Sequence, residues 1–150
     1  MLLSPVTDHA VLQRDVPIPL FGCARPGAAI IVDFRGQRWT ATAEANGRWR
    51  VAIGPFPAGG PDVLTLASPD ERVTLRDLLV GEVWVLSGQS NMAFSLRGAE
   101  HGARDAARAD CDTLRLLRLP GRVAAAPREH IPAAAWTPCR PETAADFSAV

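Results

Sequence analysis

The sequence contains no lysine, and all sixteen of its basic residues are arginine. This absence excludes a catalytic lysine and Schiff-base chemistry within the chain. The excess of arginine and alanine fits GC-rich coding rather than a function. Sixteen acidic residues balance the arginines, and no basic block is interleaved with aromatic residues. A nucleic acid is therefore not expected as a partner.

Cysteine is also scarce. Cys23, Cys111 and Cys139 are widely spaced and odd in number, a pattern that favours neither a zinc-ligand cluster nor a disulfide framework. We expect all three to be buried free thiols.

Long apolar runs are missing. No segment approaches the roughly 18 residues that span a bilayer, so a membrane is not an expected partner. Residues 1–5 lack the charged start and apolar stretch of a secretion signal, and they do not indicate a compartment. With 150 residues, 47% of them hydrophobic, the chain has enough apolar surface for a globular core.

Short apolar or alternating segments separated by turn residues run from Val11 to Leu79. This pattern is typical of an antiparallel β-sandwich. The expected strands are Pro17–Gly22, Ala29–Phe34, Gln37–Thr42, Arg48–Ile53, Val63–Leu66 and Val73–Leu78.

Asn46-Gly47 lies between two of these segments, and Asn-Gly tolerates the positive φ angles of a two-residue hairpin. We therefore predict a hairpin there. In the second segment Trp49, Val51 and Ile53 alternate with polar or small residues, as expected of a half-buried strand.

The pattern changes near Val80-Gly81. The run Val83–Leu86 is apolar at every position, as in a strand covered on both faces of a parallel sheet. We place a domain boundary here, with an N-terminal β-sandwich domain at residues 1–80. Residues 81–150 would begin a second domain of the α/β class.

The downstream pattern supports that class. Glu100–Asp110 is expected to be a short helix, with Glu100 and Arg104 spaced to pair, and Leu114–Leu119 a second strand. Val123–Thr137 carries several prolines and reads as a loop. Strand, helix and strand imply an α/β domain. Helical spacing continues over Pro141–Val150 without a terminating signal, so we expect an incomplete domain.

Gly88-Gln89-Ser90-Asn91-Met92 follows the expected buried strand and precedes an expected helical turn at Asn91–Leu96. Ser90 would then lie at the carboxyl end of a strand, where open α/β sheets place their ligand crevices. A serine there can act as a nucleophile, provided that a base activates it. The competing interpretation is that Ser90 only caps the helix.

Met92 rules out the Gly-x-Ser-x-Gly elbow of α/β-hydrolases. The run Gly88–Met92 instead resembles the first motif of SGNH (GDSL-like) hydrolases, in the form found in sialate O-acetylesterases. Further segments that resemble this family, in the expected order, are Asp8–Arg14, Val80–Trp84, Trp136, Cys139–Thr143 and Asp146–Val150.

The resemblance implies a flavodoxin-like SGNH catalytic domain and a serine esterase that removes acetyl groups from O-acetylated sugars. Ser90 would be the nucleophile and its backbone N–H an oxyanion donor, supported by Gly88, Gln89 and Asn91. No cofactor or metal is implied, and the family suggests a secreted or periplasmic location. Ala93 departs from the acidic residue that similar proteins often carry.

The resemblance also implies that the histidine and aspartate partners of Ser90 follow residue 150. None of His9, His101 and His130 lies in the expected Asp-x-x-His pattern, so we expect supporting or surface roles for them. His9 could help dock the sandwich against the catalytic domain. The chain alone should then have negligible esterase activity.

The alternative function is a non-catalytic module that binds carbohydrate or another partner through the sandwich. Trp39 and Trp49 are its candidate stacking platforms. Their alternating strand context favours burial, which would prevent such stacking.

Overall fold

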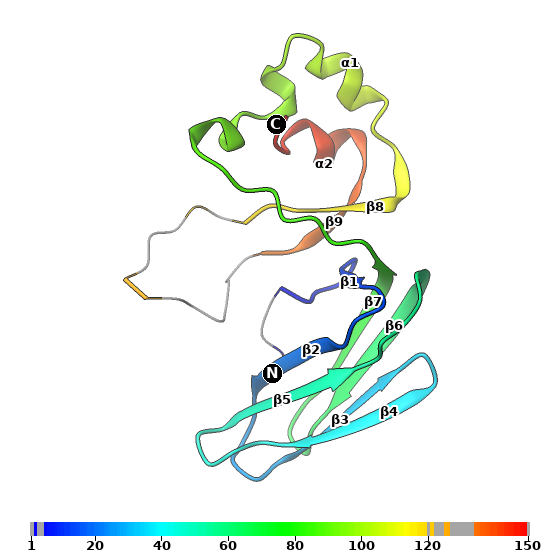
Figure 1. The fold of residues 1–150 in the computed structure, drawn as a ribbon, viewed down its shortest axis with the longest axis vertical. Helices are drawn as coiled ribbons and strands as arrows, with labels where there is room; N and C mark the ends of the chain where they lie inside the picture. The colour runs from blue at the N-terminus through cyan, green and yellow to red at the C-terminus, as the bar shows by residue number, and fades with distance from the viewer. Residues whose placement is uncertain (1, 3–4, 120, 122–124, 127–133, 150) are drawn as a thin grey trace.

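The computed structural model describes residues 2, 5–119, 121, 125–126 and 134–149 (Figure 1). Strands β1 to β7 form the β-sandwich that the sequence predicts. One sheet has the order β1-β7-β6-β3-β4, and the other pairs β2 with β5. All pairings are antiparallel except that of β1 with β7. The strand bounds are β1 Val11–Gln13, β2 Ile18–Cys23, β3 Ala29–Phe34, β4 Gln37–Thr42, β5 Arg48–Ile53, β6 Gly59–Ala67 and β7 Arg72–Gly81.

The core lies between the two sheets. Leu20 and Ile53 come from the β2–β5 sheet, while Phe34, Leu64 and Leu78 come from the larger sheet. All five are at most 1% exposed. Inward apolar residues alternate with outward polar ones along these strands, so burial of the apolar face drives the two sheets together.

The β3–β4 hairpin joins two of the strands expected from the sequence. Its two turn residues, Arg35 and Gly36, have φ angles of 47° and 73°. Two successive positive φ values characterise the type I′ turn, whose twist suits paired strands. The strand bounds are those expected from the sequence.

The predicted hairpin at Asn46-Gly47 is only half right. Gly47 turns with a φ of 79°, and its N–H donates to Glu44 O at 2.9 Å. However, β4 pairs with β3 while β5 pairs with β2, so the turn carries the chain from one sheet to the other. The physical reason is that Trp49 and Ile53 bury against the opposite sheet, which an in-plane hairpin would not allow.

Strands β6 and β7 are longer than predicted. The segment Gly59-Gly60-Pro61, which precedes the predicted strand Val63–Leu66, forms the start of β6 beside the end of β7. The register shifts between Gly59 and Leu64, which accommodates the glycines and the proline at an irregular sheet end.

The predicted buried strand at Val83–Leu86 is wrong for this chain. The run has no strand structure, and Trp84, Val85 and Leu86 are 82%, 87% and 58% exposed. A strand needs a neighbour for its backbone hydrogen bonds, and no described strand pairs with this run. Its apolar sequence is therefore unmatched by any packing partner in the described residues.

The described residues from 82 to 149, here called the C-terminal region, lie at one end of the sandwich (Figure 1). Its strands β8 and β9 pair antiparallel, and the helices lie beyond them. The predicted strand-helix-strand crossover is thus absent from the described part, because the second strand pairs with residues expected in a loop. The element bounds are η1 Ser90–Ala93, η2 Leu96–Gly98, α1 Gly102–Ala107, β8 Cys111–Leu117, β9 Trp136–Cys139 and α2 Pro141–Ala145.

Helix ends also differ from expectation. Helix α1 begins after Glu100, so the expected pair with Arg104 does not form, and Arg104 contacts Asp105 instead. Helix α2 ends at Ala145 with Asp146 as its C-cap. The helix is therefore shorter than the helical spacing over Pro141–Val150 predicted. No described helix has the length and apolar character needed to cross a membrane.

Candidate active site around Ser90

Ser90 is exposed and is the first residue of the short 3₁₀ helix η1. The N-cap is Gln89, which makes no side-chain capping bond. The interpretation of Ser90 as a helix cap is therefore wrong. Among the described residues, no side chain hydrogen-bonds to its hydroxyl, which leaves the oxygen accessible to a ligand.

The motif around Ser90 is a tight turn. The Met92 N–H donates to Gln89 O at 3.0 Å, and a Cβ added at Gly88 would lie 3.0 Å from Met92 Cγ. Gln89 and Asn91 are exposed beside Ser90. Gly88, Gln89 and Asn91 thus flank the serine in an exposed turn, with Met92 folded back against the glycine.

The segment after the motif is joined to the end of the described chain. Leu96 N–H donates to Phe147 O and Ala149 N–H donates to Phe94 O, both at 2.9 Å. Arg97 adds a 2.9 Å contact with Asp146. The residues that follow the Gly88–Met92 motif therefore lie beside Asp146–Ala149, and Arg97 is 49 positions from Asp146 in the sequence.

The segment before the motif is anchored to the sandwich through Gln13 of β1. The Val83 N–H donates to Gln13 Oε1 at 2.8 Å, and Gln13 Nε2 donates to Glu82 Oε2 at 3.2 Å. The Arg14 N–H donates to Gly81 O. The exit from β7 is fixed by these contacts, whereas the next residues are exposed.

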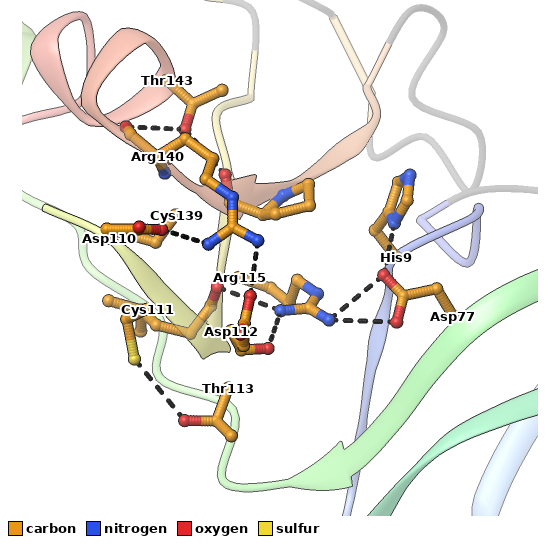
Figure 2. A network of polar contacts seen from close by, with 12 residues as sticks. His9, Asp77, Asp110, Cys111, Asp112, Thr113, Arg115, Cys139, Arg140 and Thr143 are labelled. Carbon is orange, nitrogen blue, oxygen red and sulfur yellow. Dashed lines mark hydrogen bonds and ion pairs between the residues drawn. The ribbon is translucent and has the colours of Figure 1, made fainter.

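The described histidines do not activate Ser90. His9 and His101 make no hydrogen bond to it, and His130 lies outside the described residues. His9 instead contacts Asp77, with Nδ1 2.7 Å from Oδ2. The same carboxylate accepts two bonds from Arg115 Nη2, each 3.1 Å long (Figure 2). His9 therefore supports the junction between the sandwich and β8.

The contacts at this junction favour the charged form of the Asp77 carboxyl. The hydrogen bond with His9 and the charge of Arg115 hold the pKa of the Asp77 carboxyl below its usual value, although partial burial opposes them. His9 and Asp77 have φ angles of 63° and 54°, conformations that non-glycine residues seldom adopt. Sequence reasoning missed Asp77 and Arg115, since nothing in a strand pattern signals a contact made across a junction.

The cysteines are partly other than predicted. Cys139 is buried, but Cys23 and Cys111 are exposed, so the expectation of three buried thiols fails for two of them. Cys111 stands at the exposed start of β8, where no described element covers it. No group of three or more metal-ligating side chains occurs within the described part of the chain.

The tryptophan platforms of the alternative function are not available. Trp49 is only 3% exposed, and Trp39 is half-buried with its ring edge-on to Phe56 at 5.9 Å. Buried or occupied ring faces cannot stack on a sugar. This observation removes the specific basis for a binding module centred on these two residues.

Comparison with known proteins agrees with this geometry. No protein-family model matches the chain. The solved structure of a carbohydrate acetylesterase from Xanthomonas citri superposes with a TM-score of 0.96 and 38% identity, covering 99% of this chain and 34% of that one. At the level of class, the chain is thus a relative of carbohydrate acetylesterases.

Two relatives found by sequence comparison carry the same name. Sialate O-acetylesterase from Mus musculus is 32% identical over 104 residues, which cover 62% of this chain and 19% of that protein. The Homo sapiens enzyme is 33% identical over 104 residues, with 62% and 20% covered. The chain is thus a homologue of sialate O-acetylesterases, and it spans about a fifth of the length of these relatives.

Proposed function

We propose that this chain is the nucleophile-bearing part of a carbohydrate O-acetylesterase, and that Ser90 is its nucleophile. The observation that carries the proposal is an accessible serine in the Gly88–Met92 turn of a chain so similar to a carbohydrate acetylesterase. The substrate class would be an O-acetylated sugar such as a sialic acid, in keeping with the names of the relatives.

The proposed reaction has two steps. The Ser90 oxygen attacks the acetyl carbonyl carbon while a base takes its proton, and the sugar oxygen leaves with a proton. Water then attacks the acetyl-serine, which releases acetate and restores the hydroxyl. The Ser90 backbone N–H would donate to the negative oxygen of each tetrahedral intermediate. This scheme needs no cofactor or metal.

The base and its orienting carboxylate are proposed to lie outside these 150 residues. Support comes from the described histidines, since His9 is engaged by Asp77 and neither His9 nor His101 contacts Ser90. A serine without a base is a weak nucleophile. We accordingly propose that the chain alone has negligible turnover.

The same reasoning supports residues 1–80 as a sandwich domain and 81–150 as the beginning of an SGNH-type α/β domain. The exposed run Trp84-Val85-Leu86 has the composition of a buried segment but no cover. In a longer enzyme, further parts of the catalytic domain would cover it. The solved acetylesterase supports this reading, because this chain accounts for only 34% of its length.

A chimera tests the proposal. This chain would replace the matched third of the Xanthomonas citri acetylesterase, and acetate release would be measured with an aryl acetate and an O-acetylated sialoside. We expect activity in the chimera, a loss of about 10⁴-fold or more in Ser90→Ala, and little change in Ser87→Ala, a neighbouring exposed serine. Equal activity of the Ser90→Ala and parent chimeras would overturn the assignment of Ser90.

The proposal that the isolated chain has negligible turnover is tested separately. Acetate release from the 150-residue chain should match the uncatalysed background. If the chain alone shows turnover and Ser90→Ala abolishes it, Ser90 remains the nucleophile, but the proposal that the base lies outside these 150 residues is refuted.

A further inference from the structure

Two of the three cysteines are cross-strand neighbours in the β8–β9 pair. Cys111 and Cys139 are Cα partners at the first position of one strand and the last of the other. Directly opposed residues of antiparallel strands have Cα atoms about 4.5–5.5 Å apart, inside the range of about 4.4–6.8 Å that disulfides span. The strand register thus gives this pair a backbone spacing compatible with a disulfide, although the two residues are 28 positions apart in the sequence.

Two ion pairs hold the strand positions of Cys111 and Cys139 in register. Arg140, directly after Cys139, contacts the carboxylates of Asp110 and Asp112, the two residues that flank Cys111 (Figure 2). Beyond this point the register shifts, so that Arg115 opposes Pro138. The cysteine pairing is therefore fixed by its own contacts rather than by a long regular ladder.

The two thiols differ in environment. Cys111 is exposed, and its sulfur lies 3.5 Å from Thr113 Oγ1. Hydrogen bonding by Thr113 lowers the pKa of the Cys111 thiol, whereas burial raises the pKa of Cys139. Cys139 is 4% exposed, with its sulfur 4.0 Å from Ala109 O. An accessible thiol and a shielded one thus occupy cross-strand partner positions, which suits an attacking and a resolving cysteine.

We propose that Cys111 and Cys139 form a thiol–disulfide site that reacts with small disulfides such as oxidised glutathione. The Cys111 thiol loses its proton to water, and the thiolate attacks one sulfur of the small disulfide. A mixed disulfide forms, and one small thiolate leaves. The Cys139 thiol loses its proton to water, and its thiolate attacks the Cys111 sulfur and releases the second small thiolate. The two protons released by the cysteines are taken up by the two small thiolates. Two cysteine thiols are oxidised and one small disulfide is reduced to two thiols.

The product would covalently join β8 to β9. Both strands contact the sandwich, β8 through Arg115 to Asp77 and β9 through Trp136, whose indole N–H donates to Pro5 O at 2.8 Å. The disulfide would therefore stabilise the hairpin that carries these contacts. Its formation is independent of esterase chemistry, since no step involves Ser90.

The test uses the 150-residue chain with Cys23→Ser, which removes the third cysteine. After incubation with oxidised glutathione, blocking of remaining thiols and proteolysis, mass spectrometry should find the Cys111 and Cys139 peptides joined, with an intact mass lower by two hydrogens. Before oxidation, iodoacetamide should modify Cys111 at least about tenfold faster than Cys139. Joined peptides should also form in the parent chain, with Cys23 left outside the link.

Two controls make the result decisive. In Cys23→Ser/Cys139→Ser, the glutathione adduct on Cys111 should persist, because the resolving thiol is gone. In Cys23→Ser/Cys111→Ser, Cys139 should acquire little adduct. A stable Cys111 adduct in the presence of Cys139, links only between different chains, or no reaction of folded protein would each overturn the proposal. Circular dichroism of each variant establishes that the protein compared is folded.

Discussion

Arg115 and Asp77 form a two-point ion pair, in which one guanidinium nitrogen donates to both carboxylate oxygens at 3.1 Å. The Arg115 side chain is only 5% exposed, whereas that of Asp77 is 33% exposed. The pair joins β8 of the C-terminal region to β7 of the sandwich (Figure 2). Since a shielded cation depends strongly on its partner, this contact should be a main determinant of how the two parts associate.

Replacing Asp77 with asparagine should destabilise the protein by about 1–2 kcal/mol, because Arg115 would lose its charged partner in a shielded position. Asparagine tolerates the positive φ at this position, so the change removes the charge with little backbone cost. Urea unfolding followed by circular dichroism measures the effect. The exposed aspartate Asp105, paired with Arg104, provides the control, and its asparagine variant should change stability by less than about 0.5 kcal/mol. If both substitutions lower the free energy of unfolding equally, the Asp77–Arg115 pair does not make the special contribution to stability that is expected here.

The same residue predicts a pH dependence. A carboxyl whose pKa is lower in the folded than in the unfolded protein adds stability above the unfolded value of 3.8, and that stability is lost as the pH falls through the lower, folded value. The stability difference between the parent and Asp77→Asn should therefore be full near about pH 6 and shrink below about pH 4. Urea titrations across this interval would measure it. A difference that grows on acidification would have the wrong sign for this account.

A close backbone contact predicts a second destabilised variant. At Gly102, the first residue of α1, an added Cβ would lie 1.7 Å from the Leu96 backbone oxygen, which no side-chain rotation can relieve. Gly102→Ala should therefore cost about 2 kcal/mol or more. Gly121, where an added Cβ would meet no atom of the described residues within 4 Å, is the control, and its alanine variant should be near neutral. Thermal unfolding of both variants compares them, and a neutral Gly102→Ala would show that η2 and α1 are not packed as described.

Trp136 predicts a smaller effect on the other side of the junction. Trp136→Phe keeps most of the ring but loses the 2.8 Å hydrogen bond to Pro5 O, which should cost about 1 kcal/mol. Trp84, 82% exposed, is the control for changing a tryptophan to phenylalanine, with an expected change below about 0.5 kcal/mol. If chemical denaturation ranks Trp84→Phe as the more damaging variant, the exposed position of the Val83–Leu86 run is wrong.

Local signals predicted the sandwich well. Alternation predicted the inward face of β5, and the apolar segments predicted the bounds of β3 and β4, because both signals depend on residues close in the sequence. At Asn46-Gly47 the turn was predictable but not the sheet change, since a turn motif does not say which strand its neighbour will pair with. Sheet assignment is decided by burial of Trp49 against residues far away in the chain.

The C-terminal region was less predictable for a similar reason. An apolar run such as Val83–Leu86 becomes a strand only beside other strands, and none of the described ones pairs with it. The Ser90 motif was found because its five residues are contiguous. The junction of His9, Asp77 and Arg115 brings together three distant positions, and no single-sequence pattern reports such a meeting.

Covalent labelling tests the central claim about Ser90 most directly. The chimera with the Xanthomonas citri acetylesterase would be treated with an organophosphorus serine-hydrolase probe, digested and mapped by mass spectrometry. The account predicts one modified peptide, containing Ser90, and no labelling of the isolated 150-residue chain above that of its Ser90→Ala variant. A catalytically active chimera that carries its label on another serine would contradict it.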